Sequence, residues 1–316
     1  MNTREQALER NPKLVSIVLP VFNGARFLRQ ALDSCLQQTY RDLELIVVDN
    51  GSTDNSAAIV QSYHDPRITL LRHPTNRKVA GALNTGFRHA RGAYLTWTAH
   101  DDYYAPTAIA EMVQVLEANP HVHIVFANEY YVDDADNILS FFKTGPVEQL
   151  AERNCIELCF LYRRIVYETV GAYDARAFLA EDYDYWLRAS AYFTFAHLDR
   201  PLLYVREHAA RLSTRYGRGE VTEVALAIRR RALGRDLRRN RTILSRVHVT
   251  AAGRLYEIPR RAAAGRALLW ALAFDPRCLR EYRVKVLLAR LCVGPHGVRF
   301  LQWLKQTLRR LAAYPP

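Results

Sequence analysis

The sequence predicts an α/β fold with a mostly parallel central sheet flanked by helices, followed by a helical C-terminal region. Three observations support this fold class. The chain has 316 residues, 49% of them hydrophobic, which is enough to bury a sizeable core. Short apolar runs alternate with amphipathic helical patterns as far as about Asp133, and from Thr222 onward the pattern is helical almost throughout. Strands that alternate with helices are typical of a parallel sheet.

The predicted strands are short apolar runs, as expected for a sheet covered on both faces. They span residues 15–19, 43–48, 68–71, 94–98 and 122–127. The predicted helices between them cover residues 26–38, the segment around 57–60, residues 81–90, and a segment opened by Pro106. Polar residues that directly follow these strands deserve most weight, because ligands of such sheets bind at the carboxyl ends of the strands.

The charge of the chain is unevenly distributed. The formal net charge is +12, yet residues 1–205 hold 19 Lys and Arg against 25 Asp and Glu, whereas residues 206–316 hold 25 against 7. We therefore expect two domains, residues 1–215 as the α/β domain and residues 216–316 as a basic, amphipathic helical region. A basic region of this kind favours an acidic partner, and its alternation of Arg with Leu and Trp suits an anionic membrane surface better than nucleic acid.

Cysteines and terminal segments indicate the compartment. The five cysteines show no C-x-x-C spacing and are expected to be reduced core thiols. The N-terminus is polar and charged, unlike a secretory signal, and the apolar stretch 262–274 is interrupted by Arg266 and too short to span a bilayer. We expect a cytoplasmic protein that lies peripherally on the inner face of the cell membrane.

Several common motifs are absent from the sequence. No G-x-G-x-x-G follows the first strand, and neither a P-loop, a G-x-S-x-G elbow nor H-E-x-x-H occurs. Carboxylates remain as the main candidates for chemistry. Asp101 and Asp102 follow a strand and form an oxygen-rich site suited to Mg²⁺ or Mn²⁺. The cluster that begins with Glu181 and Asp182 can provide a general base, because burial raises a carboxyl pKa toward neutrality; an ordinary acidic helix start is the alternative.

Taken together, these segments resemble family 2 glycosyltransferases, which have the GT-A fold and transfer a sugar from a nucleotide donor with inversion. The resemblance covers residues 14–213. Its residues are VSIVLPVFNGARFLRQALDSCLQQTYRDLELIVVDNGSTDNS, then Asn76, Gly81, Asn84, Gly86 and Gly92, then YLTWTAHDDYYAP, VGAYDARAFLAEDYDYWLRAS and PLLYVREHAARLS.

The resemblance implies roles for individual residues, and Asp182 is the implied catalytic base. Asp102 and His208 are implied ligands of the divalent cation. The implied nucleotide-sugar-binding residues are Pro20, Phe22, Asn23, Asp49, Arg77, Asn84, Asp101, Glu181 and Arg206. A UDP- or dTDP-sugar is the expected donor. The expected acceptor is a sugar or lipid-linked precursor in surface polysaccharide or glycolipid biosynthesis.

The sequence departs from the family pattern in three places. Asp49-Asn50-Gly51 stands where Asp-Asp-Gly is common, and Ala99 stands where the metal motif often begins with an acidic residue. The Q-x-x-R-W motif of processive synthases is absent after Asp182, so we expect transfer of one sugar per acceptor. Two alternatives stay open: a related sugar nucleotidyltransferase, and a nucleic-acid- or membrane-binding protein that uses its basic region.

Overall fold

The computed structural model describes residues 12–233, 237–257, 260–280 and 282–292. The chain divides into two compact units, Met1–Arg211 and Leu212–Pro316. Each unit has its own cluster of buried apolar side chains, so each is described by itself.

The first unit is built on one sheet with the strand order β3-β2-β1-β4-β8-β6-β9-β5, and β7 pairs with β6. The strands are β1 Val15–Val21, β2 Leu43–Asp49, β3 Ile68–Arg72, β4 Tyr94–Trp97, β5 Tyr103–Tyr104, β6 Ile124–Val132, β7 Ile138–Phe142, β8 Phe160–Arg163 and β9 Phe195–Arg206. The four strands from β3 to β4 are parallel, as predicted. Beyond β4 the sheet is mixed, since β8 is antiparallel to both of its neighbours while β6 and β9 are parallel to each other.

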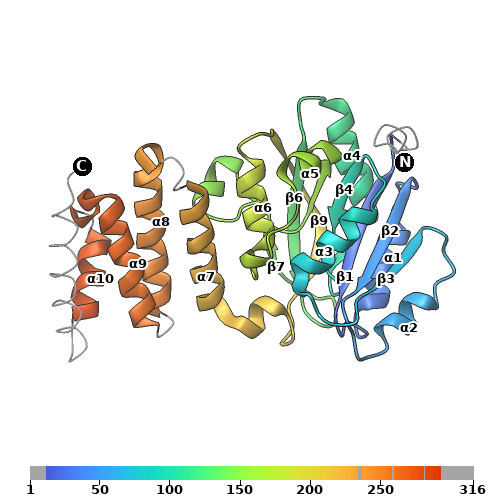
Figure 1. Ribbon diagram of the computed structural model, residues 1–316, viewed down its shortest axis with the longest axis horizontal. Coiled ribbons are helices and arrows are strands. Elements are labelled where there is room, and N and C mark those ends of the chain that lie inside the picture. Colours follow the sequence, from blue (N-terminus) through green and yellow to red (C-terminus); the bar gives the residue numbers. More distant parts are fainter. Residues whose placement is uncertain (1–11, 234–236, 258–259, 281, 293–316) are drawn as a thin grey trace. The chain divides into compact units, whose positions relative to one another are not determined.

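Helices cover both faces of this sheet (Figure 1). They are α1 Leu28–Leu36, α2 Ser56–Gln61, α3 Lys78–His89, α4 Ala108–Ala118, α5 Arg164–Val170 and α6 Glu181–Ala189, with the short 3₁₀ turns η1 Val147–Ala151 and η2 Ala175–Ala177. The fold class predicted from the sequence is confirmed. The predicted helix at 26–38 begins and ends two residues inside those limits, and the one at 81–90 begins three residues earlier, at Lys78.

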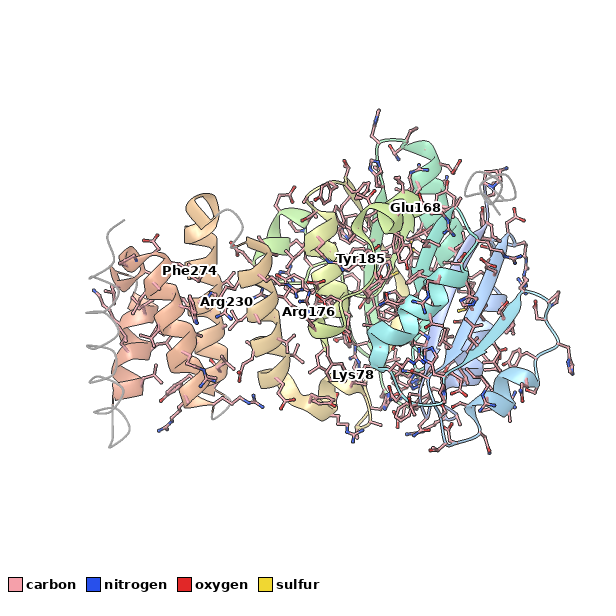
Figure 2. All side chains as sticks on the ribbon, viewed as in Figure 1. Lys78, Glu168, Arg176, Tyr185, Arg230 and Phe274 are labelled. Atoms are coloured by element: carbon pink, nitrogen blue, oxygen red, sulfur yellow. The ribbon has the colours of Figure 1, made fainter. Side chains whose placement is uncertain are left out.

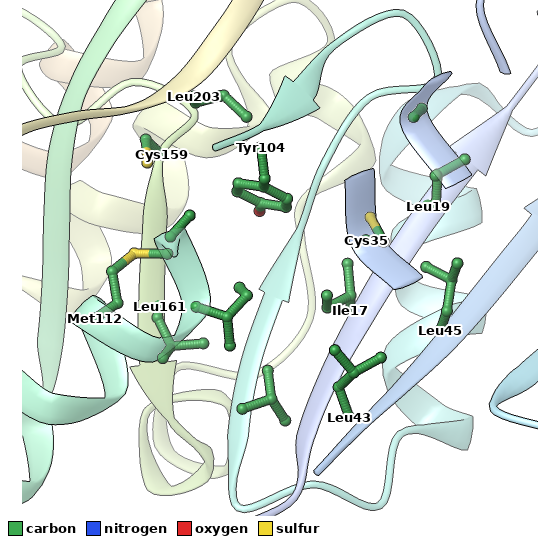
Figure 3. Packing of buried hydrophobic residues seen from close by; sticks show 14 of the residues in the cluster. Ile17, Leu19, Cys35, Leu43, Leu45, Tyr104, Met112, Cys159, Leu161 and Leu203 are labelled. Atoms are coloured by element: carbon green, nitrogen blue, oxygen red, sulfur yellow. The ribbon is translucent and has the colours of Figure 1, made fainter. Parts of the chain in front are cut away.

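Side chains of β1 alternate between the two helical layers, as the pleat of a strand requires. Ile17 and Leu19 belong to the buried cluster that includes Cys35 of α1 and Met112 of α4, and Figure 3 shows these side chains together. Val18 points to the opposite face. There α3 approaches so closely that a Cβ on Gly86 would lie 2.3 Å from Cγ1 of Val18. The glycine thus permits the tight seating of α3 on the strands that end at the candidate site.

The second unit consists of helices, as predicted for the C-terminal region. They are α7 Leu212–Leu233, α8 Leu237–Glu257, α9 Arg261–Phe274 and α10 Tyr282–Cys292, with the 3₁₀ turn η4 Pro276–Arg280. Its buried cluster combines Leu255 of α8 with Leu268 of α9 and Val284 of α10. Among the residues that the structure describes, no helix is both long enough and apolar enough to cross a bilayer.

Candidate functional site

The first part of the site lies where β1 ends. Pro20 is the last residue but one of the strand, Phe22 is 40% exposed, and Asn23 adopts a left-handed backbone with φ of 52°. The backbone N–H of Thr53 donates to Oδ1 of Asn23 at 2.8 Å, and the N–H of Asn23 donates to the Ser52 hydroxyl at 3.0 Å. These bonds hold the loop after β1 against the loop after β2.

Asp49 ends β2 and is completely buried. Its Oδ1 accepts a hydrogen bond from the N–H of Ser52 at 3.0 Å, and its Oδ2 pairs with the half-exposed Arg72 at 3.1 Å. A pocket of about 420 Å³ opens beside this carboxylate. It is lined by Gly51, Ser52, Thr53, Arg72, His73 and Pro74. The pocket therefore lies at the carboxyl ends of β2 and β3, the position at which ligands bind such sheets.

Asn50 connects this pocket to the start of α3. Its Oδ1 is hydrogen-bonded to His73 at 2.8 Å and accepts from the backbone N–H of Arg77 at 3.0 Å. Its Nδ2 donates to the carbonyl of Lys78 and to Oδ1 of Asn76, both at 3.0 Å. Asn50 is almost fully buried, and this network explains how Asn serves in place of a second carboxylate. The exposed Arg77 thereby lies next to the pocket.

The acidic pair after β4 forms a second group with the end of β9. Asp101 is hydrogen-bonded to Nε2 of His208 at 2.8 Å, and Oδ1 of Asp102 accepts the backbone N–H of Arg206 at 2.9 Å. His100 packs against Gly24, where an added Cβ would lie 2.1 Å from the imidazole ring. The loop after β1 and the acidic pair are therefore in direct contact.

The two carboxyl groups of the pair have opposite pKa shifts. Burial alone would raise the pKa of Asp101, but the charge of His100 and the hydrogen bond to His208 outweigh it, so its pKa lies below the ordinary value. Burial, and then the charge of Asp101, raise the pKa of Asp102 above its ordinary value. The charge of Asp101 makes a second negative charge on Asp102 unfavourable, so a cation beside the pair would stabilise it.

Arg206 was expected to contact the nucleotide sugar, but its guanidinium group is bonded inside the protein. It is 1% exposed, and its N–H groups donate to the carbonyl of Asp133 at 2.7 Å, to Gln30 at 2.7 Å and to Asp136 at 2.6 Å. It also lies over the ring of Phe27, 4.5 Å from the centroid. Because these contacts occupy the group inside the protein, the geometry does not support a phosphate contact by Arg206.

Glu181 and Asp182 are the first two residues of α6, where negative side chains stabilise the positive end of the helix dipole. Burial raises the pKa of Glu181 to about 7, and its Oε1 is buried without a hydrogen-bond partner. Asp182 is half-buried, and its Oδ2 accepts a hydrogen bond from Asn154 at 2.8 Å. Burial raises the pKa of Asp182, while bonds from the Tyr183 backbone and Asn154 oppose that shift.

Asn84, an implied nucleotide-sugar-binding residue, is hydrogen-bonded to the backbone of Tyr173. Its Nδ2 donates to the carbonyl of Tyr173 at 2.9 Å, and its Oδ1 accepts the N–H of the same residue at 2.8 Å. Tyr173 stacks on Tyr185 of α6 with ring centroids 4.3 Å apart. Both amide atoms of Asn84 are thus used to hold the chain that leads into α6.

Sequence reasoning missed four residues around Asp102 and Asp182, namely Asn154, Glu129, Glu157 and Arg211. Glu129 is fully buried, and its pKa is raised to about 8 by burial. Burial and the charges of Glu129 and Asp182 raise the pKa of Glu157. Arg211 lies within electrostatic reach of Asp102 and Glu157 and forms an ion pair with Glu207 at 2.6 Å. An acidic residue in a mostly apolar strand, as Glu129 is in β6, was the available sequence signal.

The donor set partly fits a divalent cation. Within the described ranges, no group of three His, Cys, Asp or Glu side chains is arranged to hold a metal ion. Oδ2 of Asp102 makes no hydrogen bond there, whereas Nε2 of His208 is engaged by Asp101. Magnesium and manganese sites often use one or two carboxylates and complete their coordination with water and substrate phosphates. Asp102 therefore fits such an ion, and His208 fits it through Nδ1, because metal-binding histidines commonly keep a carboxylate on their other ring nitrogen.

The family comparison identifies the domain. Residues 16–171 match the model of glycosyl transferase family 2. The chain is 33% identical over 198 residues to an uncharacterized glycosyltransferase of Rickettsia typhi, a match that covers 57% of this chain and 61% of that protein. It is 33% identical over 144 residues to glycosyltransferase GlyG of Streptococcus pneumoniae, covering 44% and 48%. The chain thus spans less than two thirds of the length of these relatives.

Solved structures resemble this chain over most of its length. TarS 1–349 of S. aureus in complex with UDP-GlcNAc has a TM-score of 0.65 at 15% identity, and the match covers 94% of this chain and 91% of that one. Mannosyltransferase PcManGT from Pyrobaculum calidifontis, in complex with GDP-Man and Mn²⁺, has a TM-score of 0.54 at 18% identity and covers 94% and 86%. At such identities the likeness shows the fold, which is of the GT-A type predicted.

The reciprocal bonds of Asn84 give a testable expectation. Asn84→Ala leaves the N–H and carbonyl of Tyr173 without partners, which should lower the free energy of unfolding by about 2 kcal/mol. Denaturant unfolding of the full chain measures this change. Gln114→Ala, at an exposed amide within α4, is the control and should change stability by no more than about 0.5 kcal/mol. Equal stability of the two variants would contradict the positioning role of Asn84.

Proposed function

Because residues 16–171 make this chain a member of glycosyl transferase family 2, we propose that the protein transfers one sugar, with inversion, from a nucleoside-diphosphate donor to an acceptor hydroxyl. The observation that supports the proposal is that the pocket, the acidic pair after β4 and the start of α6 are linked. Asn50 and Lys78 connect the pocket to Glu181, and the charges of Glu129 and Glu157 connect Asp102 to Asp182. The α/β unit up to about residue 215 holds this catalytic machinery.

We assign the nucleoside to the pocket beside Asp49. We assign Pro20, Phe22, Asn23 and Arg77 to nucleoside binding as well, and the bonds of Asn23 to Ser52 and Thr53 of the pocket lining support this. Asp49 is positioned by Ser52 and Arg72 to accept a hydrogen bond from the base. A UDP- or dTDP-sugar is the proposed donor. The UDP and UDP-GlcNAc complexes of TarS, which shares the fold, are consistent with the first of these.

Asp182 is the proposed general base. Its Oδ2 is oriented by Asn154, and its raised pKa keeps it a better proton acceptor than an exposed carboxylate. As the acceptor oxygen attacks the anomeric carbon, its proton passes to Asp182. The bond from that carbon to the distal phosphate oxygen breaks, and the electron pair leaves with the nucleoside diphosphate. One displacement from the opposite face inverts the anomeric centre. Glu181 is the proposed contact of the transferred sugar.

Asp102 is the proposed protein ligand of Mg²⁺ or Mn²⁺, together with His208 through Nδ1, the ring nitrogen that Asp101 does not engage. When bound, such an ion supplies Lewis-acid stabilisation of the charge on the departing diphosphate. Asp101 holds His208 in place by their 2.8 Å hydrogen bond. The Mn²⁺ complex of PcManGT is consistent with this assignment.

We propose that the second unit binds an anionic membrane surface, placing the enzyme on the inner face of the cell membrane near a lipid-linked acceptor. Trp270 is 44% exposed on α9, and Arg230 of α7 lies over its ring at 4.6 Å. Exposed tryptophan beside arginine suits the interface between lipid headgroups and water. An acceptor in surface polysaccharide or glycolipid biosynthesis is consistent with that location.

The base assignment predicts a catalytic defect without loss of donor binding. Asp182→Asn should lower turnover by about 10²-fold or more, because the amide cannot accept the proton. Release of nucleoside diphosphate from a panel of UDP- and dTDP-sugars with a mixture of acceptor sugars measures turnover, and mass spectrometry of products should show one added sugar. Asp199→Asn, on the surface, is the control and should keep full activity. Full turnover in Asp182→Asn would eliminate the assignment.

The hydrogen bond from Asn154 to Asp182 predicts that the pH dependence of activity shifts when Asn154 is removed. Asp182 acts as a base only when ionised, so activity falls as pH falls through its pKa. The hydrogen bond from Asn154 lowers that pKa, and its loss in Asn154→Ala therefore raises it. The acid limb of the pH–rate profile should move to higher pH in the variant, while activity on the alkaline side changes less. A limb at the same pH in both proteins would show that Asn154 does not tune Asp182.

The membrane assignment predicts selective sedimentation with anionic vesicles. The full chain should sediment with phosphatidylglycerol vesicles and remain in solution with phosphatidylcholine alone. Removal of one interfacial arginine in Arg230→Gln should weaken binding by roughly 5-fold. Arg176→Gln, an exposed arginine of the first unit paired with Asp174, is the matched control and should bind as the wild type does. Retention on DNA without binding to vesicles would overturn this assignment.

A further inference from the structure

Lys78 has a backbone conformation that is unusual for its side chain. It is the first residue of α3, and its φ is 60°, in the left-handed region that is unfavourable for a residue with a Cβ. Two amide side chains, the buried Asn50 and the exposed Asn76, hold it there. Its N–H donates to Oδ1 of Asn76 at 2.7 Å, and its carbonyl accepts Nδ2 of Asn50 at 3.0 Å. Strain that is retained in this way is typical of functional positions.

The side chain of Lys78 is exposed and reaches toward the segment that precedes α6. Figure 2 labels it at the start of α3. Its ammonium nitrogen lies 4.4 Å from the centroid of the Phe178 ring, and its charge lowers the pKa of Glu181. The next residue after Phe178, Leu179, is also left-handed, with φ of 78°. Among the described residues no carboxylate forms an ion pair with Lys78.

Lys78 lies between the pocket proposed for the nucleoside and Glu181, the proposed contact of the sugar. On one side, Asn50 joins it to His73 in the wall of the pocket. On the other side lies Glu181, whose Oε1 is buried and has no hydrogen-bond partner in the described structure. In a nucleoside-diphosphate sugar the two phosphates lie between the nucleoside and the sugar. A cation between the pocket and α6 is therefore placed at the phosphates.

The other arginines near the site are already occupied. Arg206 is bonded inside the protein, Arg72 pairs with Asp49, and Arg211 pairs with Glu207. The side chain of Arg77 lies over the first turn of α3. A Cβ added at Gly81 would lie 2.6 Å from the Cβ of Arg77. A cation–π contact made by an exposed ammonium group is weak, so Lys78 can leave the partly buried Phe178 ring for a negatively charged phosphate.

We infer that Lys78 is a further catalytic residue, which binds the distal phosphate of the donor through its ammonium group and stabilises the negative charge that this phosphate gains as the bond to the sugar breaks. The inference rests on the proposed function and adds the residue that replaces Arg206 as the cation of the leaving group. Phe178 holds the ammonium group in the absence of donor, and the strained backbone of Lys78 directs it to that position.

Calorimetry with nucleotides tests the inference without knowledge of the sugar or the acceptor. The probes are UDP against UMP, and dTDP against dTMP, each with Mn²⁺ and again in EDTA. Lys78→Gln should bind the diphosphates about 10-fold more weakly than the wild type does, because a charged hydrogen bond is lost. Its affinity for the monophosphates, which lack the distal phosphate, should stay within about 2-fold. Lys78→Arg should restore diphosphate binding.

Two further variants separate this role from a structural one. Lys78→Gly relieves the left-handed strain, so its Tm should equal or exceed that of the wild type, yet it should lose diphosphate affinity as Lys78→Gln does. Lys143→Gln removes an exposed lysine paired with Asp199 and should leave all nucleotide affinities unchanged. Equal diphosphate binding by the wild type and Lys78→Gln overturns the inference and leaves the proposed function intact. If the wild type binds none of the four nucleotides, the proposed function itself fails.

Discussion

The site depends on one constraint, which is that three neighbouring parallel strands end at the same edge of the sheet. In the β1–β2 register Val21 lies opposite Asp49, and in the β1–β4 register Val18 lies opposite Trp97. The apolar side chains of these strands are buried between two helical layers, so the strands cannot slip without exposing their core. Every polar residue that follows them must therefore emerge at that edge, where the loops contact one another.

Burial then gives the emerging carboxyl groups distinct properties. Asp49 is tied to a backbone N–H and to Arg72, Asp101 is held by His208, and Asp102 keeps an oxygen without a hydrogen bond among the described residues. Asp182 arrives from α6 with a raised pKa. In the proposed mechanism aspartate thus binds the nucleobase, positions His208, binds the cation and accepts the proton, because the local partners of each aspartate differ.

The strands that begin the fold and the carboxylates that follow them were predictable, because apolar runs followed by polar residues carry a local signal. The mixed half of the sheet was not. β9, Phe195–Arg206, contains Pro201 and several charged residues, and its pairing with β6 is interrupted by register shifts. Asn154 and Arg206 show the same limit within the site. Asn154 bonds Asp182, which is 28 residues away in the chain. The guanidinium of Arg206 is oriented by Gln30 and Asp136, so tertiary contacts decide both roles.

Backbone strain shows how the stability of the core supports the geometry of the site. In the described part of the chain, the non-glycine residues with positive φ are Asn23, Lys78, Asp136, Glu157 and Leu179. Asn23 is bonded to Thr53 of the pocket lining, and Asn50 connects Lys78 to His73 of the same lining. Glu157 lies within electrostatic reach of Asp182, Leu179 stands three residues before it in the chain, and Asp136 accepts a hydrogen bond from Arg206. Each such residue costs of order 1–3 kcal/mol and persists only where its surroundings determine it. Their gathering around one edge of the sheet indicates that the loops there are shaped for binding, at the expense of stability that the buried strands supply.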